Sequence, residues 1–114
     1  MMKSRKELVA EYQQMKKPIG VFQIRNLSNG KVFIDSSNNI TSKWNRHKME
    51  LKFGSHRHKT LQNDWNDLGE DQFVLEFLSE LKIEDDDDVN IERELQLLFD
   101  MVVEELNLSV DQRY

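Results

Sequence analysis

Hydrophobic periodicity divides the start of the chain into a helix and a hairpin. Apolar residues recur at helical spacing over residues 4–17, and beyond Pro18 they occupy every second position over residues 20–37. The first pattern predicts an amphipathic helix, and the second predicts two strands, because alternate side chains of a strand share one face. Asn29-Gly30 separates the strands and favours a tight turn, since both residues tolerate positive φ. The helical face consists of Leu8, Val9, Tyr12 and Met15.

Two shorter helices are predicted after the hairpin. Residues 41–53 repeat apolar residues at helical spacing, Thr41 or Ser42 is the expected cap, and Gly54 closes the helix. The loop SHRHK then leads to a third helix, which Gly69 terminates. We interpret the tryptophans of both helices as core residues rather than base-stacking platforms. The two stripes are Ile40, Trp44, His47 and Leu51, followed by Leu61, Trp65 and Leu68.

A strand, an acidic run and a long helix complete the pattern. Alternation of Phe73, Leu75 and Phe77 predicts a third strand in QFVLEFLSEL. The run EDDDD at 84–88 predicts an exposed loop, and it lacks the glycine and the spaced ligands of a calcium-binding loop. Beyond this run, an apolar stripe predicts a long helix. That stripe is Ile91, Leu95, Leu98, Val102 and Leu106.

This order of elements predicts an α+β fold with a small three-stranded antiparallel sheet flanked by helices. The length of 114 residues, of which 38% are hydrophobic, supports one modest core. We expect a helix at residues 1–17 and one compact domain over residues 18–114. The chain has no cysteine, which excludes disulfides and thiolate chemistry, and no apolar run of membrane-spanning length. A cytoplasmic protein is the expectation.

Charge is distributed unevenly along the chain. Residues 1–62 hold thirteen Lys and Arg against four Asp and Glu, whereas residues 63–114 hold three against seventeen. The first half is therefore expected to attract an anion and the second half to repel it.

Four stretches of the chain resemble the GIY-YIG endonuclease family. GVFQIRNLSNGKVFIDSS resembles the two strands that carry GIY and YIG around an asparagine-glycine turn. ITSKWNRHK is similar to a segment in which an arginine precedes a tryptophan and a histidine follows three residues later. GSHRHKTLQNDWNDLGEDQF resembles a segment with a histidine, an LQ pair, an aromatic residue and a glycine. NIERELQ looks like the stretch that supplies the metal-binding glutamate of phage intron homing endonucleases, and the likeness covers about residues 18–96.

The resemblance implies a site whose chemistry is altered. Enzymes of the family hydrolyse a phosphodiester with one divalent cation held by the glutamate, a tyrosine or histidine that acts on the attacking water, and an arginine that steadies phosphate charge. The equivalent positions here are Phe22, Phe33, Lys43, His47, His56 and Glu94.

Three of these positions, and one neighbour, depart from the family pattern. Phe22 and Phe33 stand where the family has tyrosines, and a benzyl ring has no proton to exchange. Lys43 replaces the arginine and loses its bidentate grip on phosphate oxygens. Asp35 replaces the glycine of YIG and puts a side chain where substrate backbone would approach.

The remaining polar residues allow two interpretations each. Glu94 either holds a metal or pairs with Lys43 as an ordinary ion pair. His47 is either a hydrogen-bonded residue at the edge of the core or a proton-transfer group. His56 carries the family likeness, but with His58 it forms an H-x-H pair that lacks a third ligand for structural zinc.

Three functions follow from these alternatives. The first is an inactive GIY-YIG-like domain, without a cofactor, that acts as a regulatory or weak nucleic-acid-binding module. The second is a residual DNA endonuclease that uses Mg²⁺ or Mn²⁺ and has His47 or His56 as its base. The third is a protein-interaction module whose acidic C-terminal half docks on a basic partner. The candidate phosphate-binding residues are Lys31, Lys43, Arg46, Lys48, Lys52, Arg57 and Lys59.

Homing endonucleases of this family append a separate binding module after the catalytic domain. Because this chain stops at Tyr114, we expect no sequence-specific homing.

Overall fold

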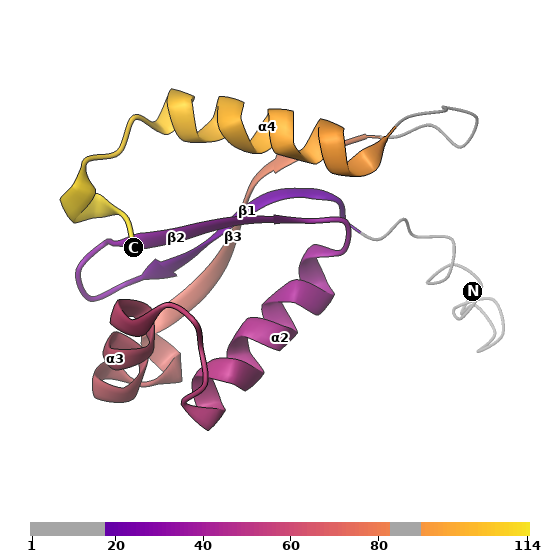
Figure 1. The fold of residues 1–114 in the computed structure, drawn as a ribbon. Helices are drawn as coiled ribbons and strands as arrows, with labels where there is room; N and C mark the ends of the chain where they lie inside the picture. Colours follow the sequence, from indigo (N-terminus) through magenta and orange to yellow (C-terminus); the bar gives the residue numbers. More distant parts are fainter. Residues whose placement is uncertain (1–17, 83–89) are drawn as a thin grey trace, which may run out of the picture.

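A three-stranded antiparallel sheet lies between helices on its two faces (Figure 1). The computed structural model describes residues 18–82 and 90–114, so the helix predicted at 4–17 and the acidic run at 84–88 lie outside the described residues. The α+β fold predicted from the sequence is confirmed. The strands are β1 (Gly20–Asn26), β2 (Val32–Ser37) and β3 (Phe73–Glu80), and the helices are α2 (Ile40–Phe53), α3 (Lys59–Leu68) and α4 (Ile91–Leu106), with short 3₁₀ turns at Glu70–Gln72 and Val110–Gln112.

The strand order β2-β1-β3 places the first strand at the centre of the sheet. Phe22 on β1 lies opposite Asp35 on β2 and opposite Phe77 on β3. The β1–β2 hairpin forms as predicted, but its connection is wider than a two-residue turn, because β1 ends at Asn26 and β2 begins at Val32. Gly30 takes the left-handed conformation, with φ of 78°, whereas Asn29 does not and instead accepts a hydrogen bond from the backbone of Lys31.

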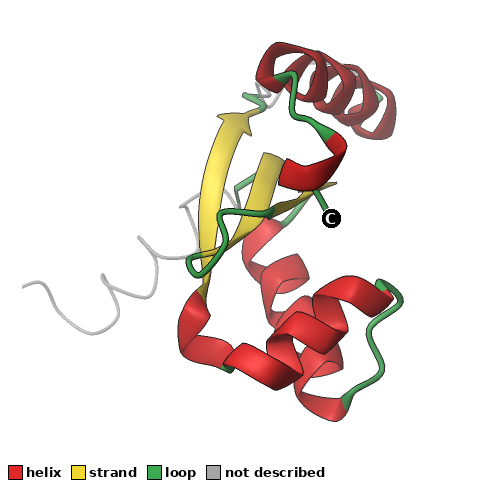
Figure 2. Ribbon diagram, turned by 90° about the vertical axis from the view of Figure 1, so that its left-hand side faces the viewer, coloured by secondary structure: helices red, strands yellow, loops and turns green. Residues whose placement is uncertain are grey.

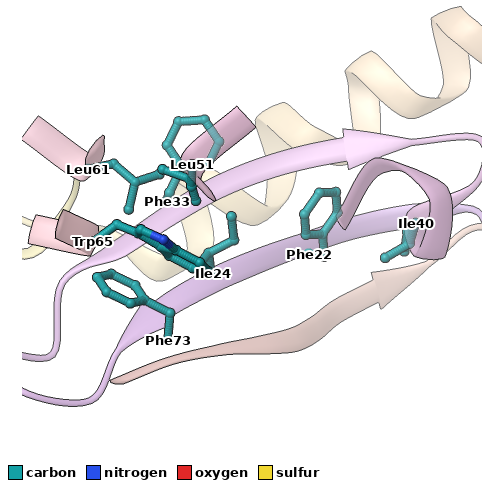
Figure 3. Close-up of a cluster of buried hydrophobic side chains, with 8 residues drawn as sticks. All are labelled: Phe22, Ile24, Phe33, Ile40, Leu51, Leu61, Trp65 and Phe73. Carbon is teal, nitrogen blue, oxygen red and sulfur yellow. The ribbon is translucent and has the colours of Figure 1, made fainter. Parts of the chain in front are cut away.

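Alternation along β1 and β2 sends successive side chains to opposite faces, and each face has its own core. Phe22, Ile24 and Phe33 pack with α2 and α3 on one face, shown in close-up in Figure 3. On the other face α4 covers a smaller apolar cluster, and Figure 2 shows this helix on the opposite side of the sheet from α2 and α3. The buried members of the second cluster are Val21, Val32, Ile34 and Val102.

The ends of the helices set the direction of the side chains that matter for the site. Gly54 and Gly69 end α2 and α3 with φ of 74° and 90°, as predicted. The cap of α2 differs from the prediction of Thr41 or Ser42: Asn39 caps the helix, and its Oδ1 accepts a hydrogen bond from the backbone of Ser42 at 3.2 Å. The helix begins one residue earlier than expected because Ile40 is itself buried against the sheet.

The predicted apolar sides of the later elements are covered to different extents. Trp65 is buried and Trp44 packs against the same cluster, which agrees with their interpretation as core residues. On β3, Phe73 is 5% exposed but Phe77 is 61% exposed. Phe73 packs against the ring of Trp65 on α3, 5.2 Å away, whereas α2 packs on β1 and β2. In the part of the chain that the structure describes, none of the helices combines the length and apolar character needed to cross a membrane.

Candidate functional site

Three histidines surround the ring of Phe33 on the face of the sheet that α2 and α3 cover. His47 comes from α2, His56 from the loop after it, and His58 from the N-cap of α3. Their rings lie 5.4, 5.7 and 5.6 Å from that of Phe33, each nearly perpendicular to it. Edge-to-face contacts of this kind fix ring orientation as well as bury area. Phe33 is therefore the packing centre of the histidine cluster.

A chain of hydrogen bonds connects the histidines to Asp35. The backbone N–H of His58 donates to Nδ1 of His56 at 3.0 Å, so this nitrogen carries no proton. Nε2 of neutral His56 is then the protonated nitrogen and donates to Nδ1 of His47, 2.9 Å away. Nε2 of His47 in turn donates to Oδ2 of Asp35 at 2.8 Å. Each proton position follows from the backbone donor at one end and the carboxylate at the other.

His56 is held in place by a buried amide as well as by its ring partners. Its backbone N–H donates to Oε1 of Gln62 at 3.0 Å, and Nε2 of Gln62 donates to the carbonyl of Leu51 at 2.8 Å. Burial disfavours the charged form of His56 and lowers its pKa below the ordinary value of 6.5, and positive charge at neighbouring groups acts in the same direction. His56 therefore acts as a neutral link at the edge of the core.

Asp35 is a carboxylate with three polar neighbours. Besides the bond from His47, its Oδ1 accepts from the backbone of Ser36 at 2.8 Å, and Nζ of Lys43 lies 3.9 Å from its Oδ2. Burial by itself would raise the pKa of Asp35. The hydrogen bonds from His47 and Ser36 and the charge of Lys43 outweigh burial and hold the pKa below 3.8. Asp35 is therefore ionised at neutral pH.

A pocket of about 470 Å³ opens beside this network. Three of its lining residues are cationic, and one, Glu50, is acidic and pairs with Nε of Arg46 at 3.0 Å. Positive charge around a polar pocket with one paired carboxylate suits an oxyanion such as phosphate. The lining residues are Lys43, Arg46, His47, Glu50, Ser55 and Arg57.

The structure gathers five of the six family-equivalent positions on one face. Phe22, Phe33 and His56 are buried beside His47, and the ring of Phe22 lies 6.2 Å from that of His47. Lys43 lies one helical turn before His47 on α2.

Glu94 is separate from the other five. It lies in the first turn of α4, and it is not among the residues that line the pocket. Helix α4 itself packs on the face of the sheet opposite to α2 and α3 (Figures 1 and 2). The ion pair with Lys43 that the sequence allowed is absent, because Lys43 pairs with Asp35.

The seven basic residues proposed for phosphate binding do not all converge. Three of them, Lys43, Arg46 and Arg57, line the pocket. The others have different surroundings, and Lys52 pairs with Glu70 at 3.5 Å. Lys31 lies 5.6 Å from the ring of Tyr114, Lys48 lies 5.3 Å from the ring of Trp44, and Lys59 is the first residue of α3.

The possible metal ligands fit a metal poorly. His47, Glu50 and His56 offer atoms within 4.8 Å of one another, and Glu94 belongs to no such group among residues 18–82 and 90–114. A metal needs an unprotonated nitrogen. The bond from His58 to Nδ1 of His56 leaves the proton on Nε2, the nitrogen that faces His47.

Several residues of the network were not assigned from the sequence as its members. Asp35 was noted only as a departure from the family pattern, and neither Gln62 nor the capping role of His58 was identified. A signal for Asp35 was present, since it lies two residues after Phe33 and therefore on the same face of β2. Lys43 and His47, four residues apart, likewise share one face of α2. Gln62 belongs to the LQ pair of the family resemblance, but its hydrogen bonds to His56 and Leu51 were not predicted.

Comparison with known proteins agrees with the fold. No protein-family model matches the chain. Over 92 residues the chain is 33% identical to intron-associated endonuclease 1 of Enterobacteria phage T4, a match that covers 81% of this chain and 34% of that protein.

Two solved structures are similar as well. A glutamate-to-alanine variant of the catalytic domain of intron endonuclease I-TevI matches with a TM-score of 0.68 and 28% identity, over 85% of this chain and 91% of that one. The catalytic domain of homing endonuclease I-TevI matches with a TM-score of 0.65 and 27% identity, over 83% and 96%. The chain is therefore a homologue of a T4 intron-associated endonuclease and has the fold of the I-TevI catalytic domain, a GIY-YIG nuclease.

Proposed function

We propose that this domain binds nucleic-acid phosphate at the pocket beside His47 and does not hydrolyse the phosphodiester. The names of its homologue and of the similar structures denote endonucleases, which act on nucleic acid. Lys43, Arg46 and Arg57 supply positive charge to one pocket, and Ser55 adds a hydroxyl. Each phosphate that such residues neutralise makes binding more sensitive to salt.

The main support for the absence of hydrolysis is that the candidate general bases already have hydrogen-bonding partners. Both ring nitrogens of His47 and of His56 have a hydrogen-bonding partner within 3.0 Å. The two motif positions that would offer a hydroxyl are phenylalanines, Phe22 and Phe33, which are 0% and 8% exposed. A general base must be within hydrogen-bond reach of the water that it activates. The ring nitrogens of His47 and His56 are already hydrogen-bonded, and the rings of Phe22 and Phe33 have no proton acceptor. None of these four side chains therefore offers a free general base.

One observation favours the second candidate function, a residual metal-dependent nuclease. The Asp35 carboxylate accepts the Nε2–H of His47 and thereby fixes the orientation and tautomer of its ring, as carboxylates do for catalytic histidines. Nδ1 of His47 would act as the base if the Nε2–H of His56 no longer donated a hydrogen bond to it. Glu94 would then be the ligand for Mg²⁺ or Mn²⁺. Docking of the acidic C-terminal half on a basic protein stays a prediction.

Cleavage of plasmid and single-stranded DNA with Mg²⁺ or Mn²⁺ separates the two functions. We expect no cleavage by the wild type. Cleavage that disappears in both Glu94→Ala and His47→Ala would establish the residual nuclease and refute the proposal.

Binding is measured on the same DNA at several salt concentrations. We expect weak binding whose affinity falls with salt, and Arg57→Gln should weaken it because this residue lines the pocket. Arg25→Gln is the matched control, since Arg25 pairs with Glu76 on the sheet, is not among the residues that line the pocket, and removes the same charge. Equal weakening by both variants, or no binding at low salt, would contradict the proposal.

A further inference from the structure

The carboxylate of Asp35 accepts hydrogen bonds from the same donors that an external phosphate would use. Its carboxylate accepts the Nε2–H of His47 at 2.8 Å and the backbone N–H of Ser36 at 2.8 Å, with Nζ of Lys43 at 3.9 Å. An imidazole N–H, a backbone N–H and an ammonium group are the donors that commonly surround a bound oxyanion. The surroundings of the Asp35 carboxylate therefore resemble those of a bound oxyanion.

The same two residues of α2 border both Asp35 and the open pocket. Lys43 and His47 lie one helical turn apart and both line the pocket, whereas Asp35 contacts them from β2 and is not part of the lining. The side chain of Asp35 is 16% exposed and that of Lys43 is 32% exposed. An oxyanion entering the pocket would thus meet two groups already engaged from the side of the sheet.

An internal carboxylate has an advantage over an external anion because it is tethered in place and pays no association entropy. Phosphate in the pocket can then use Arg46 and Arg57, but must displace Asp35 to gain Lys43 and the N–H of His47. Arg46 is itself shared with Glu50 at 3.0 Å. The pocket therefore binds phosphate with only part of its positive charge.

We propose that Asp35 is an internal anion that occupies the phosphate-binding position formed by Lys43 and His47 and thereby weakens binding of nucleic-acid phosphate at this site. The inference rests on the proposed function, whose phosphate pocket it regulates. Asp35 competes with phosphate for Lys43 and His47. Removing the charge of Asp35 should therefore expose a stronger anion site without adding any residue.

The first test compares Asp35→Asn with a matched control in DNA binding. Asp35→Asn keeps the shape of the side chain and frees Lys43 from its ion pair. Glu76→Gln removes the same charge and frees Arg25, with which Glu76 pairs at 3.0 Å elsewhere on the sheet. We expect about tenfold tighter binding at low salt for Asp35→Asn only, with a salt slope steeper by about 0.7 to 0.9 for one added phosphate contact. Equal gains for the two variants would overturn the inference.

The second test asks whether Lys43 is the group released. Lys43→Met should weaken DNA binding clearly more in the Asp35→Asn background than in the wild type, where Asp35 already engages Lys43, and should reverse most of the gain that Asp35→Asn brings. The same loss in both backgrounds would mean that Lys43 is free to bind phosphate despite Asp35, and the inference would be wrong. If circular dichroism shows that Asp35→Asn is poorly folded, Asp35→Gly, which removes the carboxylate entirely, replaces it in the comparison with Lys43→Met and the double variant.

Inorganic phosphate separates this inference from the proposed function. With ¹⁵N-labelled histidine, phosphate should shift the ring signals of His47 in Asp35→Asn at concentrations that leave the wild type unchanged. That result without DNA binding by any variant would refute the proposed function and retain the internal anion. Equal shifts in wild type and variant, or no shift in either, would overturn the inference.

Discussion

The two faces of the sheet use the same strands for different purposes. On the α4 face the buried residues are apolar, among them Val21, Ile34 and Val102. On the face of α2 and α3, the apolar cluster borders a buried polar network that contains His47, His56 and Gln62. Buried polar groups cost free energy unless each is hydrogen-bonded, and in the described part of the chain no buried side-chain N or O atom lacks a partner. The difference indicates that the α4 face serves as a scaffold and that the face of α2 and α3 carries the candidate site.

The largest expected effect comes from truncating adjacent residues of β2 that point to opposite faces. Phe33→Ala should lower the free energy of unfolding by about 3–5 kcal/mol and Ile34→Ala by about 2–5 kcal/mol, because each leaves a cavity. Only Phe33→Ala removes the ring that contacts all three histidines. Urea unfolding measures the stability, and histidine NMR signals report the network. Equal disturbance of those signals by Ile34→Ala at a temperature where both variants are folded would break the comparison.

A smaller effect is expected from two glutamines, one on each side of the sheet. Gln62→Leu should lower the free energy of unfolding by about 1–3 kcal/mol, since it leaves the buried N–H of His56 without its acceptor and removes one of the two hydrogen bonds to the Leu51 carbonyl. Gln96→Leu on α4 is the control, because the side chain of Gln96 is exposed and donates to Asp100 at the surface, and the effect of this change should stay within about 0.5 kcal/mol. Similar losses in chemical denaturation would show that the buried network is not specially sensitive.

The smallest expected effect is a dependence of stability on acid that arises on the site face. His56 has a folded pKa below its ordinary 6.5, so the unfolded chain binds its proton more readily and stability falls as pH drops below about 6.5. Asp35 has a folded pKa below 3.8, so its contribution is present above that pH and is lost as pH falls through the lower folded value.

Thermal unfolding from pH 7 to pH 3 measures both steps. Asp35→Asn should remove the lower step and keep the upper one, whereas His56→Gln should remove the upper step. Stability of the wild type that stays level between pH 6.5 and pH 5 would contradict the role assigned to His56.

Much of the fold could be predicted because its signals are local. Period-two alternation around Gly30 predicted the hairpin, and Gly54 and Gly69 marked the helix ends, since backbone conformation at these points depends on the residue itself. The cap of α2 was wrong by two or three residues, because burial of Ile40 extends the helix back to Asn39. Burial is a property of packing, which the local pattern does not contain.

The candidate site could be predicted only in part. Resemblance to the family indicated Phe22, Phe33, Lys43, His47 and His56, and the structure brings these together. The partner of Lys43 was not foreseen, because Asp35 approaches it from another element. The strength of this ion pair depends on the distance between the two charged groups, and distances between elements arise from the way the strands and helices pack.

The sequence by itself determined the elements, their order, and which chemical groups are missing from the motif. Phe22 and Phe33 have no hydroxyl whatever the fold does, because that is a covalent property. Only the tertiary structure decided that Asp35, His47 and His56 form one hydrogen-bonded chain and that Glu94 belongs to a helix that packs on the other face of the sheet. Hydrogen bonds and ion pairs act over a few ångströms, so the packing of α2 and α4 on opposite faces sets which groups meet.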